Sequence, residues 1–215
     1  MVAASRTPQQ ARARLTRQAL LDAAATEFSH RGYAAASVNT ILADSGHTKG
    51  ALYFHFPSKH AIAEAVADAA TDRYVEIAGP WRESDLHPVE ALSGLVGAVT
   101  AAVAAEPVLL AELRLGYDPD FTSGASGRAS RGWETVALEL AADLDQSGCI
   151  VSPFDPGRLV AAMASMLAGG RLMADLSGDP IMLQTRLDET IDVVITAMTT
   201  TETTARFVAS RAEAR

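Results

Sequence analysis

The residues whose types and spacing could do chemistry are concentrated between positions 37 and 59, in the sequence SVNTILADSGHTKGALYFHFPSK. Thr48, Lys49 and Gly50 follow a glycine turn, and they offer a hydroxyl group, an ammonium group and a bare stretch of backbone. On the first turn of a helix, these groups can hydrogen-bond base edges and approach a groove closely. The chemistry that the segment indicates is therefore recognition of nucleic acid.

The aromatic residues that follow divide into a polar pair and an apolar pair. Tyr53 and His55 can hydrogen-bond phosphate oxygens, whereas Phe54 and Phe56 are the pair that we expect to be buried. Lys59, near the start of the next helix, would suit a further phosphate. The alternative is that Tyr53 and His55 only complete an aromatic patch that seals a small three-helix core.

Local signals predict the elements that must hold these residues. A first helix is expected over residues 38–44, preceded by Ser37, whose hydroxyl can cap it. Gly46 stands where a helix-ending residue needs a positive φ, and Thr48 can cap a second helix. Ser58 is a good N-cap for the helix after that. Two short helices joined by such a turn form a helix-turn-helix, in which the second helix meets base edges.

We assign nine residues to a candidate DNA-binding set because they lie on or beside this motif. They are Arg17, Ser37, Val38, Thr48, Lys49, Gly50, Tyr53, His55 and Lys59. Arg17 and its neighbour Arg14 lie near the start of an expected helix and could meet a phosphate. Equally, both arginines could belong to an ordinary solvated helix face.

The motif resembles the DNA-binding domain of the TetR (tetracycline-repressor-like) regulators. The resemblance covers about residues 14–66, and it rests on TRQALLDAA (16–24), Phe28, Gly32-Tyr33, Ser37-Val38, Ile41 and above all SGHTKGALYFHFPSK (45–59). One departure is His47, which stands where the family usually has a small apolar residue and so affects the packing of the turn. The resemblance implies a helix-turn-helix domain followed by a helical domain for ligand binding and dimerisation.

The charge distribution supports DNA binding independently of the resemblance. Residues 1–60 carry seven basic and three acidic side chains, a formal charge of +4. Residues 61–215 carry 11 basic and 23 acidic side chains, a charge of −12, which together gives the −8 of the whole chain. An acidic protein with evenly spread charge would bind DNA poorly, but here the positive charge is segregated around the motif.

Length and composition limit what the rest of the chain can be. With 215 residues, 48% hydrophobic and 20% charged, it can form the headpiece and one larger globular domain. Its apolar stretches are interrupted and its N-terminus lacks a signal-peptide core, so we expect a cytoplasmic protein without a membrane span. The single cysteine, Cys149, and five histidines without ligand spacing predict no disulfide framework, no metal and no cofactor.

Every long element of the chain is predicted to be helical. Helices are expected over residues 12–30, 58–78 and 89–105, from Pro107 onward, and over 132–146, 157–175 and 181–198. Pro80 and Pro88 are expected to bracket a break in the chain. Between positions 116 and 132, the sequence GYDPDFTSGASGRASRG predicts a mobile loop.

The last two long helices are predicted to form a dimer interface. Each begins with an Asp-Pro pair, at Asp155 and at Asp179, which places a carboxylate at the N-cap and proline at the first helical position. Their apolar surface exceeds what a peripheral pair needs, which favours a four-helix bundle with a second copy. The alternative is that both are interior helices of a monomer. After Thr199 the weak periodicity predicts fraying.

The body also resembles a narrower group, the γ-butyrolactone receptors and related antibiotic-production regulators of actinomycetes. The similar positions are Pro107-Val108, Ala111, Arg114-Leu115, Trp133-Glu134 and Gly169-x-Arg171. The phenylalanine that often precedes the tryptophan is absent here. The resemblance implies that Trp133 lines a small-molecule pocket. Met163, Met166 and Met173 could wall the same apolar cavity. Core packing is the alternative for all four residues; we favour ligand contact for Trp133 and core packing for the methionines.

These observations predict an all-α protein with two domains. Residues 1–60 would form the helix-turn-helix domain, with residues 1–10 as a flexible arm, and residues 61–215 the ligand-binding and dimerisation domain. We expect a homodimeric repressor that leaves a pseudo-palindromic operator when a small apolar effector binds. The alternatives are a regulator with an unrelated ligand or with none. An enzyme is disfavoured, because the body has no catalytic triad, paired carboxylates or phosphate loop, and only His87 among histidines.

Overall fold

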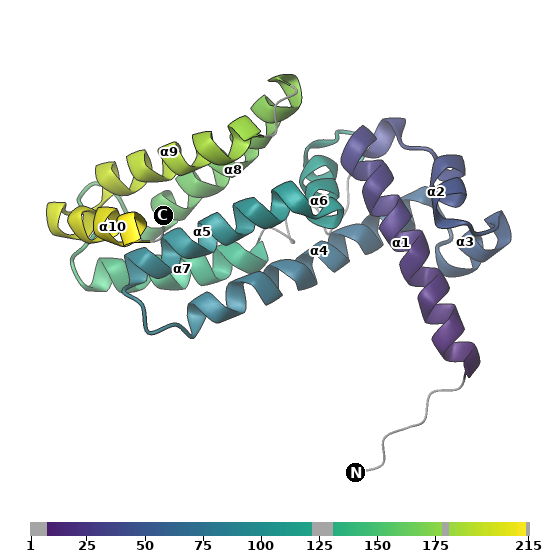
Figure 1. The fold of residues 1–215 in the computed structure, drawn as a ribbon, viewed down its shortest axis with the longest axis horizontal. Coiled ribbons are helices and arrows are strands. Elements are labelled where there is room, and N and C mark those ends of the chain that lie inside the picture. The colour runs from purple at the N-terminus through teal and green to yellow at the C-terminus, as the bar shows by residue number, and fades with distance from the viewer. Residues whose placement is uncertain (1–7, 122–130, 178–180, 214–215) are drawn as a thin grey trace, which may run out of the picture. The chain divides into compact units, whose positions relative to one another are not determined.

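The computed structural model describes residues 8–121, 131–177 and 181–213, and within these ranges the chain forms ten α-helices (Figure 1). They are α1 (Pro8–Ala35), α2 (Val38–Ser45), α3 (Lys49–His55), α4 (Lys59–Arg82), α5 (Pro88–Ala105), α6 (Pro107–Tyr117), α7 (Arg131–Gln146), α8 (Pro156–Ser177), α9 (Ile181–Met198) and α10 (Thr201–Glu213). The described residues contain no strand beyond an isolated bridge between Ile150 and Thr199. The prediction of an all-α chain is confirmed.

The helices belong to two compact units. Unit 1 holds α1 to α3, the first half of α4, and α6, and it covers residues 1–71 and 106–129. Unit 2 holds the end of α4, α5, and α7 to α10, and it covers residues 72–105 and 130–215. Unit 1 therefore takes one of its helices from the middle of the chain. The functional boundary at residue 60 remains a prediction.

Unit 1 packs around one face of α1. Leu20 and Phe28 of α1 join Ile41 of α2, Leu52 of α3 and Ile62 of α4 in one core, each without solvent exposure. Helix α6 closes this core, since its main packing partner is α1. The apolar spacing along α1 thus determines where the two short helices stand.

The expectation that Phe54 and Phe56 are both buried is confirmed only for Phe56. Phe56 is buried, but Phe54 is 81% exposed. Phe56 lies just after α3, in an extended conformation with φ −138°, and this turns its ring inward. Phe54 belongs to the last turn of α3, on a face that the core does not cover.

Unit 2 is built around α5. Eight of its residues are buried, and it packs against α7, α9 and α10. Among the described helices, α5 alone is long and apolar enough to cross a membrane. Its burial identifies it as a core helix of unit 2. Helix α7 packs on α8, which in turn lies beside α9 (Figure 1).

The break predicted between Pro80 and Pro88 is confirmed at residues 83–87, although α4 continues past Pro80 to Arg82 before it ends. Its last turn is held because Arg82 donates two hydrogen bonds to the carboxylate of Glu139, at 2.7 and 2.9 Å. The fraying expected after Thr199 is wrong, because residues 201–213 form α10 and bury Phe207.

Threonines anchor the start of α10. The backbone of Thr200 donates to the carbonyl of Cys149 at 2.9 Å, and Val151 donates to the carbonyl of Met198 at 3.0 Å. The hydroxyl groups of Thr200 and Thr203 lie 2.9 Å apart. The threonine-rich sequence therefore forms a helix start that is tied to a distant loop.

Most other helix positions agree with expectation. Helices α5, α7, α8 and α9 match the predicted ranges within two residues, and Asp155 accepts a cap bond from the Arg158 amide at 2.8 Å. Helix α1 is longer than predicted and begins at Pro8, inside the expected arm. Asp179 and the central part of the predicted loop, residues 122–130, lie outside the described residues.

Gly94 of α5 gives a test of packing in unit 2. A Cβ atom at this position would overlap the Trp81 ring, whereas a Cβ at Gly97 in the same helix would meet nothing within 4 Å. We expect Gly94→Ala to destabilise the protein by about 1–3 kcal/mol because the indole must move. Gly97→Ala, the matched control, should be neutral or stabilise by up to about 1 kcal/mol. Urea unfolding of both variants measures the difference, and equal stabilities would contradict this packing.

Candidate DNA-binding site

The helix-turn-helix is formed by the local signals that predict it. Helix α2 ends at Gly46, which has φ 67° and donates its amide to the Ala43 carbonyl at 3.3 Å. The Thr48 hydroxyl caps α3 by accepting from the Ala51 amide at 3.3 Å. The hydroxyl of Ser58 does the same for α4, at 3.0 Å from the Ala61 amide. Each of these caps confirms its prediction.

The prediction that the Ser37 hydroxyl caps α2 is wrong. The Ser37 hydroxyl makes no cap bond to α2. Instead, the Ser37 amide donates a hydrogen bond to Oε1 of Glu27 at 2.8 Å. The Glu27 carboxylate is buried, and its Oε1 lies 3.5 Å from Nε of Arg31. A side chain of α1 therefore fixes the entry to α2, and the Ser37 hydroxyl keeps its capacity for another partner.

The first turn of α3 presents its groups to solvent. Thr48, Lys49 and Gly50 are all exposed, while Leu52 on the opposite side is fully buried. The Lys49 ammonium lies 5.9 Å from the centroid of the Tyr53 ring, which is itself 43% exposed. The turn therefore offers a cation, a hydroxyl and an uncovered backbone on one side of a firmly anchored helix.

Arg17 and Lys59 of the candidate DNA-binding set also lie against aromatic rings. The Arg17 guanidinium lies 4.9 Å from the centroid of Phe56, and the Lys59 ammonium lies 4.8 Å from that of Tyr33. Lys59 also donates to the Ala34 carbonyl at 3.2 Å. These contacts orient both side chains. Their phosphate contacts remain predictions.

His55 and Val38 are partly shielded. The centroid of the His55 ring lies 5.1 Å from that of Phe54 and 6.4 Å from that of Phe56. Val38 is half-buried and packs on the core of unit 1. The structure thus brings all nine candidate residues into unit 1, and it gives Val38 a packing role as well.

Sequence reasoning missed a pair of charged side chains that hold a break in α1. Gly32 interrupts the helix with φ 69° and ψ −173°. Arg114 of α6 donates to the His30 carbonyl at 2.6 Å, and Oδ2 of Asp118 accepts from the Tyr33 and Ala34 amides at 2.7 and 3.1 Å. We call Arg114 and Asp118 the α6 clamp. They satisfy backbone groups that the break releases.

Only glycine fits this break well. Its φ lies in the left-handed region, and a Cβ there would stand 3.1 Å from Oδ2 of Asp118. The only sequence signal for this break is the Gly32-Tyr33 pair within an otherwise helical pattern. Its partners are 84 and 85 residues away in the chain, so the signal says nothing of what holds the break.

Aromatic rings pack on Tyr33, whose amide the clamp binds. Tyr33 has its ring centroid 5.2 Å from Phe121, which follows α6, and 6.2 Å from His60 at the start of α4. Partial burial raises the pKa of the Tyr33 phenol, and the nearby carboxylates of Asp118 and Asp120 raise it further. The ring therefore stays neutral at physiological pH and packs as an apolar group.

The predicted effector residues lie in unit 2 at different depths. Trp133 and Met163 are buried, Met166 is half-buried and Met173 is 51% exposed. The hydroxyl of Thr100 on α5 is also buried, and it has no hydrogen-bond partner among the described residues. An unsatisfied hydroxyl in an apolar core can hydrogen-bond a polar group of a ligand.

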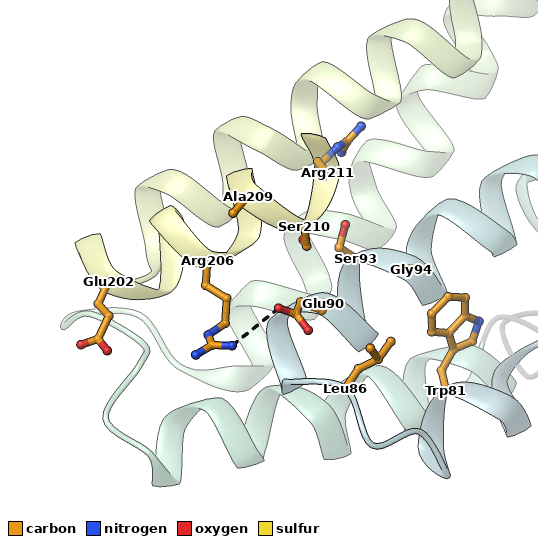
Figure 2. Close-up of a pocket in the computed structure, with 10 residues that line it drawn as sticks. All are labelled: Trp81, Leu86, Glu90, Ser93, Gly94, Glu202, Arg206, Ala209, Ser210 and Arg211. Atoms are coloured by element: carbon orange, nitrogen blue, oxygen red, sulfur yellow. Dashed lines mark ion pairs between the residues drawn. The ribbon is translucent and has the colours of Figure 1, made fainter. Parts of the chain in front are cut away.

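A groove of about 750 Å³ lies elsewhere in unit 2, between the end of α4, the start of α5, and α10. Figure 2 shows Trp81 and Leu86 on one side of it and Arg206 pointing to Glu90, to which it is paired at 3.8 Å. Two acidic and two basic residues line the groove. None of the four predicted effector residues does. Their ligand role remains a prediction.

Comparison with protein families finds a match over the motif. Residues 20–66 match the model of the bacterial regulatory proteins of the tetR family. The A-factor receptor protein of Streptomyces griseus is 51% identical over 63 residues, which are 29% of this chain and 23% of that protein. Two further relatives, both described as transcriptional repressors, are matched over 60% and 46% of their lengths. The chain thus matches less than two thirds of the length of these curated relatives.

Solved structures match nearly the whole fold. A crystal structure of a gamma-butyrolactone receptor, described as ArpA-like, has 26% identity and a TM-score of 0.79, covering 94% of this chain and 97% of that one. The TetR family protein CprB of Streptomyces coelicolor, in complex with its operator sequence, has 26% identity and a TM-score of 0.75 over the same shares. The similarity in fold therefore includes both units.

Alanine variants at Thr48 and at Ser37 should differ in stability, because only Thr48 makes a side-chain cap bond. Thr48→Ala removes the bond to the Ala51 amide, and we expect it to cost about 1 kcal/mol of unfolding free energy. Ser37→Ala removes a hydroxyl that makes no cap bond, and we expect a change within about 0.5 kcal/mol. Urea denaturation followed by circular dichroism compares them. A larger loss for Ser37→Ala would show that Glu27 does not fix the entry to α2.

Proposed function

We propose that this chain, whose residues 20–66 match the tetR family of bacterial regulatory proteins, is a member of that family and represses transcription by binding operator DNA as a dimer until a small effector releases it. The observation that carries the proposal is the first turn of α3. It exposes Thr48, Lys49 and Gly50 from a helix whose opposite side is buried at Leu52. Such a turn fits the major groove, where the start of a recognition helix meets base edges.

The other candidate residues would position the headpiece. Tyr53, His55, Lys59 and Arg17 would contact phosphates, because each carries a donor at the edge of the same motif. The net charge of +4 in residues 1–60 attracts the DNA backbone despite the acidic remainder. Lys49 would read a base edge, since it stands at the exposed N-terminus of α3.

A dimer follows from the geometry of helix-turn-helix binding. Two copies would place their α3 helices in successive major grooves, roughly 34 Å apart, on a pseudo-palindromic operator. Helices α8 and α9 would supply the interface as a four-helix bundle. In support, Met173 of α8 and Val193 of α9 are both large apolar side chains left exposed in one chain.

We infer that the effector is a γ-butyrolactone-type molecule bound in unit 2 near Trp133. A small lactone combines an apolar tail with a carbonyl group, which suits a mostly apolar core that holds the unsatisfied Thr100 hydroxyl. A bacterial operator lies in the cytoplasm, so we propose that the protein acts there. The proposed role is binding and release of DNA, which needs no catalytic residues, and we propose no enzymatic activity.

DNA binding is tested by comparing two variants of α3. Lys49→Ala should change which operator is preferred, with about 1–3 kcal/mol lost at the base pair that it reads. Tyr53→Phe should weaken binding to all sequences by about 0.5–1.5 kcal/mol, since it removes one phosphate contact. Fluorescence anisotropy at fixed salt measures both against the selected operator and random DNA. Equal affinity of the parent protein for both DNAs would refute a specific regulator.

The α6 clamp offers a test of effector control. We propose that it carries the response to the headpiece, since it holds α6 to the break in α1. Typical coupling between two ligands is roughly 5–150-fold. With an alkyl-γ-butyrolactone as effector, Asp118→Ala should reduce the parent's coupling to less than about 5-fold while lactone affinity persists.

Asp120→Ala is the matched control. Its side chain is exposed, and only its backbone amide bonds to Asp118, at 3.0 Å, so coupling should remain. Calorimetry measures lactone binding, and anisotropy measures operator release. A parent protein that binds the lactone tightly yet keeps full operator affinity would favour a regulator without this effector.

A further inference from the structure

Phe54 is the most exposed large hydrophobic side chain among the described residues. It is 81% exposed, while the residues two positions before and after it, Leu52 and Phe56, are buried. The fold therefore gains little from this ring. A large apolar side chain held in water on the recognition helix indicates a contact made with a partner.

The neighbours of Phe54 define the shape of the surface. Phe54 follows Gly50 by one helical turn, and helical side chains lean toward the N-terminus of their helix. A Cβ atom at Gly50 would find only the Thr48 hydroxyl oxygen, at 3.9 Å. The ring thus borders a stretch of uncovered backbone, and together they form a shallow apolar shelf on α3.

The ring is also held in place. The imidazole of His55 lies 5.1 Å from it, centroid to centroid, at an interplanar angle of 82°. An edge-to-face contact of this kind is favourable and restricts the orientation of both rings. The shelf is therefore partly organised before any partner binds.

We propose that Phe54 contacts the C5-methyl group of a thymine in the major groove and so determines sequence preference at one position of each half-site. This inference rests on the proposed function of the protein as a DNA-binding repressor. The thymine methyl is the apolar feature of the major groove, and phenylalanine is among the side chains that contact it. Phe54 has no hydrogen-bonding group with which to serve a phosphate.

Charge favours DNA over a protein as the partner. Lys49 is an exposed cation on the same short helix, and Arg17 lies against Phe56, two residues beyond Phe54. The +4 charge of residues 1–60 suits a polyanion. A neighbouring copy of this acidic protein is the alternative partner, and the experiment separates the two.

The experiment removes the methyl group and the ring separately. An operator is selected from random DNA with the full-length protein, and each thymine is then replaced singly by deoxyuridine, which lacks only the methyl. At one thymine in each half-site, we expect the replacement to weaken binding about 4-fold, the value of one buried methyl group. Fluorescence anisotropy at fixed salt gives the dissociation constants.

The Phe54→Ala variant completes the cycle. It should bind the thymine operator at least 4-fold more weakly than the parent, and the deoxyuridine replacement should then cost nothing further. Phe54→Leu should retain part of the dependence. Tyr53→Phe is the matched control, because it should weaken binding to thymine and deoxyuridine operators by the same factor. Circular dichroism checks that each variant is folded.

Three outcomes would overturn the inference while leaving the proposed function standing. One is a deoxyuridine effect that persists at full size in Phe54→Ala, and another is an operator with no methyl-dependent thymine. The third is unchanged DNA affinity in Phe54→Ala with a loss of association between dimers, which would assign the shelf to a neighbouring copy. A parent protein that selects no sequence at all would refute the proposed function, and this inference with it.

Discussion

The α6 clamp is the interaction on which the geometry of unit 1 depends. Arg114 and Asp118 bind opposite sides of the break at Gly32, a cation on the released carbonyl and a carboxylate on the released amides. Each charge therefore meets the backbone dipole of the sign that suits it. Beyond the break, the chain presents Tyr33 and Ala34 to Lys59, which fixes the start of α4. The position of the helix-turn-helix thus depends on a helix outside the motif.

Several side chains of the headpiece serve the fold and the candidate site together. Arg17 rests on Phe56, and Lys59 rests on Tyr33, so each cation is oriented by a ring and still reaches solvent. Glu27 is buried, yet it governs the entry to α2 through the Ser37 amide. Such shared use means that a change in affinity for DNA and a change in stability have to be measured separately in this region.

Much of the motif could be predicted from sequence because its signals are local. Gly46, Thr48 and Ser58 act within four residues of their positions. Phe54 and Phe56 could not be distinguished, since their burial depends on where α3 ends. The clamp and the start of α10 rest on contacts between distant segments, which no local pattern encodes. The effector residues are a similar case, since burial of Trp133 is what both core packing and ligand contact produce.

The discontinuity of unit 1 bears on how such regulators can be recombined. The match of residues 20–66 to a family model suggests that this segment could be transferred alone, but the structural unit also includes α6. A headpiece grafted onto a foreign body would depend on a helix of that body to supply the charges that hold the break at Gly32. Exchange of DNA specificity between relatives by genetic shuffling would therefore succeed only when two separate gene segments travel together.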